Sequence, residues 1–401
     1  MSKNTNFTGQ PVYTQILKYI DRNSIKLIAR QGEYNRYVKK LDAYTHLVTF
    51  LFAVIERYDS IREIVLGLLS NANKLGHLGI RYCIKRSTFA EANQRISSQF
   101  FGAVYAELYR SHARFLADSR RLRVKVKKLY IMDSTTISLF SNILKGAGRN
   151  RKYGKKKGGI KSHTIILADE NVPVLIRYTS AATHDHILLK ELTLSVGSYI
   201  VFDKGYVDYV QYERLTQTGI FYITKLKNNA VYESIEEIDI PDDADAGIIK
   251  DEVVVLRKKE IEHKSRRITY WDDKKKKLIV YLSNNIELTA EEIINIYRNR
   301  WQIETLFKQL KQNFPLKYFY GDSVNAIESQ IWVTMIANFL FALIQSKIKR
   351  QWAFSNLATT IRQVLMSYIN LYKFLEQPEK EWIELINNKS PAPDQMIIDF
   401  G

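Results

Sequence analysis

Residues 297–311 read YRNRWQIETLFKQLK, and this stretch constrains the fold and the chemistry of the chain more than any other. At about 100° per residue, a helix over the stretch gathers four polar side chains in a sector about 60° wide. These are Tyr297, Arg300, Glu304 and Lys311. Apolar residues recur beside them with the spacing of a core-facing helix: Ile303, Leu306, Phe307 and Leu310. The sequence therefore predicts a helix whose polar row borders a buried surface, where a functional site can form.

Two further acidic residues follow short apolar segments upstream of this helix. Residues 129–132 read as a buried strand that ends at Asp133, and residues 199–202 read as a second strand that ends at Asp203. Open α/β sheets bind their ligands at the edge where strands end. Gly205 permits a sharp turn after the second acid. An Asp in such a place is either a turn or capping residue or part of a site at the sheet edge.

Convergence of Asp133, Asp203 and Glu304 would require a counter-ion. Carboxylates about 4 Å apart repel each other by roughly 4 kcal/mol at an effective dielectric near 20. Oxygen ligands of this kind suit Mg²⁺ or Mn²⁺. Two such ions about 3.5–4 Å apart can activate a water or a 3′-hydroxyl in phosphodiester displacement. The single cysteine, Cys83, and the lack of a zinc-ligand spacing argue against a thiolate site.

The spacing Tyr-x2-Arg-x3-Glu-x6-Lys resembles the Y-R-E-K signature of the bacterial IS-four family of insertion-sequence transposases. Residues 133–135 (Asp-Ser-Thr) and 203–206 (Asp-Lys-Gly-Tyr) resemble the first and second acidic motifs of that family, in the same order. The resemblance implies that the three acids are catalytic and hold two metal ions. It also implies DNA binding by the other signature residues, Tyr297, Arg300 and Lys311. The family often carries Gly-x-Lys-x-His, as in residues 159–163, which implies that Lys161 and His163 line the site.

The function that this resemblance implies is that of a DDE transposase. Such an enzyme binds the terminal inverted repeats of its element and the target DNA, cleaves strands with metal-activated water, and transfers the freed 3′-hydroxyls. The resemblance implies cut-and-paste movement within a homodimeric synaptic complex. Two alternatives remain open: a metal nuclease of the same fold without strand transfer, and a non-catalytic DNA-binding repressor derived from a transposase.

Composition agrees with a polyanionic partner. The 401 residues include 60 Lys and Arg against 42 Asp and Glu, for a net charge of +18. We expect no membrane association, because the sequence shows no signal peptide, lipidation motif or basic amphipathic helix. The most apolar run, residues 331–344, is short and contains Asn338, which favours a buried helix. A bacterial cytoplasmic, nucleoid-associated protein is expected.

The chain is expected to divide into regions that differ in pattern. Residues 1–122 show helix-period apolar faces and are predicted to form a helical N-terminal DNA-binding domain. Residues 123–227 and 289–350 interleave strands and helices, which predicts an α/β, ribonuclease-H-like catalytic core with a mixed sheet. Residues 228–288 are predicted to be a β-rich insertion with strands over 253–256, 266–271 and 278–282. Residues 351–401 are predicted to be a C-terminal helical region.

Several basic or aromatic features admit two interpretations. Residues 145–161 combine eight Lys and Arg residues with five glycines and either follow a DNA backbone or form a solvated loop. The β-rich insertion is either a solvated meander or a direct DNA contact. Residues 274–277, all lysines, are interpreted as a solvated turn. Trp301 is interpreted as a core residue, with stacking on a base as the alternative.

Overall fold

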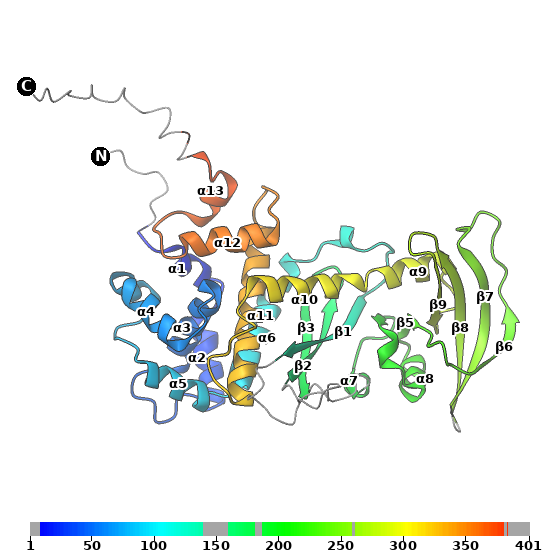
Figure 1. The fold of residues 1–401 in the computed structure, drawn as a ribbon, viewed down its shortest axis with the longest axis horizontal. Helices are drawn as coiled ribbons and strands as arrows, with labels where there is room; N and C mark the ends of the chain where they lie inside the picture. The colour runs from blue at the N-terminus through cyan, green and yellow to red at the C-terminus, as the bar shows by residue number, and fades with distance from the viewer. Residues whose placement is uncertain (1–8, 139–158, 181–186, 259–260, 381–382, 384–401) are drawn as a thin grey trace, which may run out of the picture.

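A computed structural model describes residues 9–138, 159–180, 187–258, 261–380 and 383 of the chain. At its centre is a mixed sheet in the order β3-β2-β1-β4-β5-β9-β8-β7-β6 (Figure 1). The strands are β1 (Leu129–Ser138), β2 (Gly159–Leu167), β3 (Val172–Ser180), β4 (Tyr199–Phe202), β5 (Phe221–Lys225), β6 (Tyr232–Glu237), β7 (Ile248–Lys258), β8 (Ile261–Asp272) and β9 (Lys277–Ser283).

Strands β1 to β5 form the ribonuclease-H-like half of the sheet. Strand β4 is parallel to β1 and β5 is parallel to β4, whereas β2 is antiparallel to both β1 and β3. Parallel strands with helices on both faces need apolar side chains on both sides. The neighbours Ile131 and Met132 in β1 are accordingly both buried. The predicted α/β, ribonuclease-H-like fold class is confirmed.

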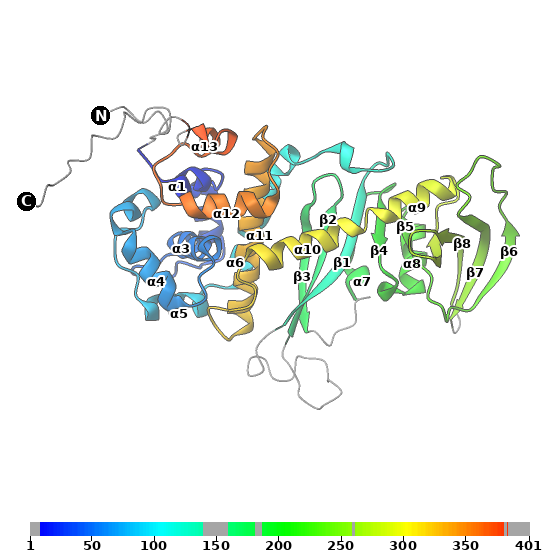
Figure 2. The ribbon, with the colours of Figure 1, turned by 45° about the horizontal axis from the view of Figure 1, so that its top comes forward.

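The two faces of this half of the sheet contact different helices. Ile131 and Val201 belong to a core shared with α6 (Ser98–His112), α10 (Trp301–Asn313) and α11 (Val324–Ser346). Met132 and Phe202, one residue further along each strand, belong to a second core with α7 (Ile187–Glu191) and α8 (Tyr209–Gln217). Helix α10 runs along the sheet on the first face (Figure 2). Any strand residue with the same alternation as Ile131 therefore faces α10.

The β-rich insertion extends the core sheet. Strand β9 pairs antiparallel with β5, and β8, β7 and β6 follow outward. The three strands predicted for this region lie in β7, β8 and β9, whereas the exposed edge strand β6 was not predicted. Strand β5 is the first strand after Asp203. Because β5 pairs with β9, the insertion is joined to the core sheet next to that acid.

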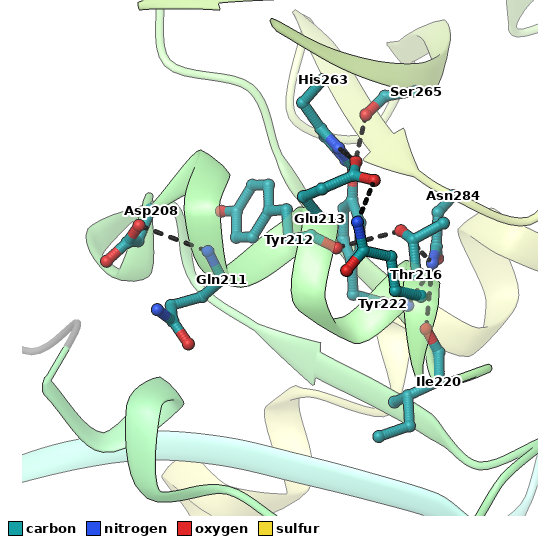
Figure 3. Close-up of polar contacts among 11 residues, drawn as sticks. Asp208, Gln211, Tyr212, Glu213, Thr216, Ile220, Tyr222, His263, Ser265 and Asn284 are labelled. Carbon is teal, nitrogen blue, oxygen red and sulfur yellow. Dashed lines mark hydrogen bonds and ion pairs between the residues drawn. The ribbon is translucent and has the colours of Figure 1, made fainter. Parts of the chain in front are cut away.

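A buried polar network ties the extension to the core on the face away from α10 (Figure 3). Nδ1 of His263 in β8 lies 2.7 Å from the Glu213 carboxylate of α8, and Nε2 lies 2.9 Å from the Tyr222 hydroxyl of β5. The Tyr222 hydroxyl is also 2.6 Å from Oγ of Ser265. Burial lowers the pKa of His263, so the neutral ring donates to Glu213 and accepts from Tyr222. Buried polar groups destabilise a fold when left without partners, so the network holds β8 against β5 and α8.

The N-terminal and C-terminal helices form one cluster that includes both ends of the described chain. Backbone N–H groups of Val12 and Tyr13 donate to carbonyls of Ser367 and Leu365 at 2.9 and 2.8 Å. The two sets of helices therefore share a core, and α11 packs between them and the sheet. The cluster contains α1 (Val12–Leu17), α2 (Arg22–Gln31), α3 (Ala43–Glu56), α4 (Ile61–Ser70), η1 (Ala72–Leu78, a 3₁₀ helix), α5 (Arg86–Arg95), α12 (Phe354–Val364) and α13 (Leu371–Glu376).

The other helical elements lie along the sheet. The short 3₁₀ helices η2 (Ala113–Phe115) and η3 (Ser119–Arg121) connect α6 to β1, and η4 (Lys204–Tyr206) directly follows β4. Helix α9 (Ala290–Arg298) packs on β5 and β7.

The apolar run at residues 331–344 lies within α11. Among the described helices, α11 alone has the length and composition to cross a membrane, but 83% of its most apolar window is buried inside the protein. The buried helix predicted there is confirmed.

Candidate active site

The signature stretch forms two consecutive helices instead of the single helix predicted. Helix α9 ends at Arg298 and α10 begins at Trp301. The side-chain amide of Asn299 donates to the carbonyls of Asn295 and Ile296 at 3.1 and 3.2 Å, which satisfies the end of α9. Tyr297 therefore comes from α9, whereas Glu304 comes from α10.

Asp133 and Asp203 occupy neighbouring strands at matching positions. Met132 pairs with Phe202 in the parallel β1–β4 ladder, so the next residue on each strand is an acid. Asp203 directly follows β4 and caps η4, where its carboxylate accepts from the Gly205 N–H at 3.4 Å. Asp133 was predicted to end its strand, but β1 continues to Ser138 because β2 pairs along its full length. Asp133 thus lies where its parallel neighbour stops, which still places it beside Asp203.

The charges of the three acids act on one another. Burial raises the pKa of Asp133 to about 6. The Ser134 N–H and the Arg300 guanidinium oppose this rise, and the carboxylates of Asp203 and Glu304 add to it. The parallel β1–β4 register and the Arg300 contacts with Asp133 and Glu304 bring the three acids to one region of the sheet edge.

Arg300 occupies the space between two of the acids. Its guanidinium donates to Asp133 at 3.3 Å and also forms an ion pair with Glu304. The Arg300 side chain is only 13% exposed and lies 5.8 Å from the centre of the Tyr297 ring. Tyr297 itself is buried, and burial raises the pKa of its hydroxyl. In this arrangement the arginine supplies the positive charge that the paired carboxylates require.

Lys311 lies further along α10 and is tied to β1. Its ammonium donates to Oγ1 of Thr135 at 2.6 Å and to the Thr136 carbonyl at 3.3 Å. Thr135 is two residues beyond Asp133 and therefore on the same face of the strand. Burial lowers the pKa of Lys311. Arg300, Glu304 and Lys311 thus follow β1 in a row, as their spacing predicted.

The three acids fit a divalent metal by their chemistry, since hard cations take carboxylate oxygens. No group of three or more His, Cys, Asp or Glu side chains is close enough to hold a metal ion within the described part of the chain. The Arg300 guanidinium contacts both Asp133 and Glu304.

Lys161 and His163 were predicted to line the site, and the pairing register places them on the opposite face of the sheet. His163 pairs with Ser134 and Lys161 with Thr136, the residues that alternate with Asp133 and Thr135. Both side chains are buried, and Nε2 of His163 lies 2.8 Å from Oγ1 of Thr179 in β3. Direct contact with the acids is therefore not supported. Most of the basic segment 145–161 lies outside the described residues.

Lys225 is a site residue that the sequence analysis missed. It ends β5, next to β4, with the same alternation that brings Ile223 into the core beneath α10. Its ammonium lies 4.9 Å from the centre of the Tyr297 ring. Burial and the nearby Arg300 lower the pKa of Lys225 to about 8, and Asp203 acts in the opposite direction. The sequence contained a signal that could have predicted Lys225 as a site residue. Lys225 comes at the end of an apolar strand, and Asp133 and Asp203 each follow an apolar run in the same way.

Trp301 is not the core residue that was predicted. The first residue of α10 is 65% exposed, directly after Arg300 in the chain. The apolar residues of the same helix point inward: Ile303, Leu306, Phe307 and Leu310. The exposed indole, directly after Arg300 in the chain, is available to a ligand.

A ribonuclease-H-like sheet with one acid within β1, one directly after β4 and one on a following helix defines a class of phosphodiester-processing proteins. Residues 125–340, more than half of the chain, match the family model described as the transposase DDE domain. Residues 8–81 match a domain of unknown function, DUF4372.

Curated relatives agree with this match. The chain is 29% identical to y4zB of Sinorhizobium fredii, named as a transposase, over 60% of this chain and 67% of that protein. It is 21% identical to a Geobacillus stearothermophilus protein named as a transposase for insertion sequence element IS5377, over 83% of this chain and 85% of that protein. A Synechocystis protein named as a transposase for insertion sequence element IS4SA is 24% identical, over 64% of this chain and 71% of that protein. The piggyBac transposase synaptic complex with hairpin DNA superimposes with a TM-score of 0.43 at 10% identity, over 98% of this chain and 88% of that one.

The chain belongs to the transposase DDE domain family and is a DNA transposase of the IS-four type. This confirms the family that the Y-R-E-K spacing predicted.

Proposed function

We propose that the protein moves an insertion sequence by cut-and-paste transposition. It binds the terminal inverted repeats, cleaves the DNA strands there, and joins the freed 3′-hydroxyls to target DNA. The observation that carries this proposal is the meeting of Asp133, Asp203 and Glu304 beside Arg300 at one edge of the sheet. A cluster of three acids is poorly suited to a purely structural role, because burial destabilises the charged form of Asp133 at its centre.

Asp133, Asp203 and Glu304 are the residues that would hold Mg²⁺ or Mn²⁺, two ions for each active site. When bound, the metals lower the pKa of an attacking water or 3′-hydroxyl and stabilise the leaving oxygen. Arg300 would leave the carboxylates and bind a phosphate of the DNA, since its planar guanidinium donates to two oxygens at once.

The other cations of the site extend this phosphate contact. Lys225 and Lys311 flank Arg300 on neighbouring elements and provide point charges toward a DNA backbone. Tyr297 is buried between Lys225 and Arg300, so it positions the two cations. Lys161 and His163 support the strand from the opposite face and are not assigned a DNA contact.

We assign a separate function to each of the predicted regions. Residues 1–122 recognise the inverted repeats, residues 123–227 and 289–350 cut and join, and residues 228–288 extend the sheet beside the site. Two ends must be brought together for joining, so a homodimer in a synaptic complex is the expected assembly. The protein acts on DNA of the bacterial nucleoid.

The decisive experiment combines the protein with Mg²⁺, a labelled duplex carrying the terminal repeat of its own element, and a supercoiled target plasmid. The proposal predicts cleaved ends and joined products. Asp133→Ala should abolish both while leaving end binding largely intact, and Asp322→Ala, at an exposed position before α11, serves as the control. Cleavage without joining would identify a nuclease, and binding without cleavage a repressor. Cleavage by Asp133→Ala would refute the assignment of the site.

A further inference from the structure

The turn between β8 and β9, residues 272–277, extends beyond the sheet edge that carries the acids. Lys225 ends β5 opposite Tyr281 of β9. The Leu226 N–H, directly after β5, still donates to the Val280 carbonyl at 2.9 Å. Because the two strands are antiparallel, residues 277–279 of β9 continue past this point and pair with β8. At about 3.3 Å per residue, Lys277 lies about 13 Å further along the strand than Tyr281. The hairpin therefore projects beside the site.

The β8–β9 turn is a concentration of exposed positive charge. Lys274, Lys275, Lys276 and Lys277 are all exposed. Two of them form ion pairs within the turn, Lys275 with Asp272 at 3.5 Å and Lys276 with Asp273 at 2.7 Å. Four lysines against two aspartates leave an excess of positive charge at the tip.

This charge faces the site. After burial and Arg300, the charges of Lys275 and Lys277 contribute to lowering the pKa of Lys225, and that effect requires proximity. Lys225, Arg300 and the turn thus form a continuous cationic wall that starts beside Asp203. The positive charge in excess of the ion pairs favours a polyanion across these residues.

The hairpin is held in place by the helix that precedes Arg300. Arg298, at the end of α9, donates to the Tyr270 hydroxyl of β8 at 3.2 Å. Tyr281 of β9 packs edge-on against Tyr297 of α9, with ring centres 5.2 Å apart. The turn is thus fixed relative to the acids, which a freely moving solvated loop would not be.

We propose that the β8–β9 turn is a DNA-backbone contact of the transposase, in which Lys275 and Lys277 hold duplex phosphates near the scissile bond. This inference rests on the proposed function. In the proposed contact the duplex runs along β9, so the 13 Å between Lys277 and the level of Lys225 correspond to about four base pairs, at about 3.4 Å per pair. The contact therefore falls about four base pairs from the cleaved phosphate. The insertion contributes binding that is independent of sequence, whereas the N-terminal helices contribute recognition.

The test compares two double variants of the full-length protein that remove the same charge. K275Q/K277Q removes two lysines of the turn, and K349Q/K373Q removes two exposed lysines, one just before and one within the C-terminal helical region. Affinity for terminal-repeat DNA is measured across a salt series without metal. Each lost phosphate contact reduces the slope of log K against log salt by about 0.9. The turn variant should lose about 2 from the slope and bind ten- to a hundredfold more weakly at 0.1 M salt, whereas the control should match the wild type.

Phosphate-ethylation interference locates the contact. Wild type should show protected phosphates about four base pairs from the cleavage site, and K275Q/K277Q should lose those alone. If the wild type cleaves its ends but the turn variant keeps the slope and the footprint of the control, the inference is wrong and the proposed function stands. If the wild type fails to bind or cleave terminal-repeat DNA, both are overturned. Matching thermal unfolding of the two variants excludes misfolding as the cause of weaker binding.

Discussion

Replacement of Asp133 by Asn should stabilise the metal-free protein at neutral and alkaline pH. Burial raises the pKa of Asp133 from 3.8 to about 6, so its charged form is disfavoured in the folded protein. At 1.36 kcal/mol per pH unit, this shift corresponds to about 3 kcal/mol of lost folding stability well above pH 6. Asn resembles the protonated acid and avoids this loss, while its side-chain oxygen can still accept from the Ser134 N–H, as Asp133 does at 2.8 Å.

The sign of the pH dependence follows from proton binding. Between pH 3.8 and 6 the folded wild type holds a proton on Asp133 that the unfolded chain releases, so wild-type stability falls as the pH rises through this window. Below pH 3.8 the wild type and Asp133→Asn should have nearly the same folding stability. From pH 5 to pH 8 the advantage of Asp133→Asn should grow by about 1.4 kcal/mol. Urea unfolding at both values measures this directly.

Bound metal should make the wild type more stable than Asp133→Asn. A ligand that binds only the folded state stabilises it, so Mg²⁺ or Mn²⁺ should raise the stability of the wild type and leave Asp133→Asn nearly unchanged. Asp273→Asn, at an exposed turn, is the matched control and should show neither effect. Two results would contradict this reasoning: Asp133→Asn being less stable than the wild type at pH 8 without metal, or a difference in stability between the two proteins that does not vary with pH. Either would show that the environment of Asp133 does not disfavour its charged form.

Three further outcomes follow from particular contacts. Asp251→Ala should cost about 3–5 kcal/mol in urea unfolding, because it leaves Arg266 buried without its bidentate partner at 2.6 and 2.9 Å; a loss no larger than that of Asp273→Ala would contradict this. Trp301→Ala should change stability by less than about 1 kcal/mol, since the side chain is 65% exposed, and a larger loss would restore the core interpretation. Lys225 has a pKa of about 8, so the wild type loses this charge and some affinity for terminal-repeat DNA as the pH rises from 7 to 9. Lys225→Arg should keep its affinity for the DNA over the same pH range in the same titrations. If the wild type and Lys225→Arg lose affinity equally, Lys225 does not contact the DNA.

Arg300 stands next to two of the three acids. Its guanidinium forms ion pairs with Asp133 and Glu304, and the same planar group suits a DNA phosphate. The residue that we propose for the phosphate contact therefore lies beside the residues that we propose for the metal.

Local sequence was sufficient for the features that depend on neighbouring residues. The apolar runs before Asp133 and Asp203, and the 3.6-residue spacing of α10, placed all three acids on the correct elements. Backbone geometry alone generates this outcome: side chains alternate along a strand and repeat every three to four residues on a helix. The β-rich runs of the insertion were recognisable for the same reason.

Tertiary structure decided everything that depends on pairing between distant segments. The β1–β2 register turned Lys161 and His163 away from the acids, and a shift of one residue would have turned them toward the site. Strand pairing also brought Lys225 beside Asp203 and carried the β8–β9 turn past the sheet edge. These placements arise from contacts between residues tens of positions apart, which no local periodicity encodes. The chain alone therefore determined which residues could do the chemistry, and the folded sheet decided which of them meet.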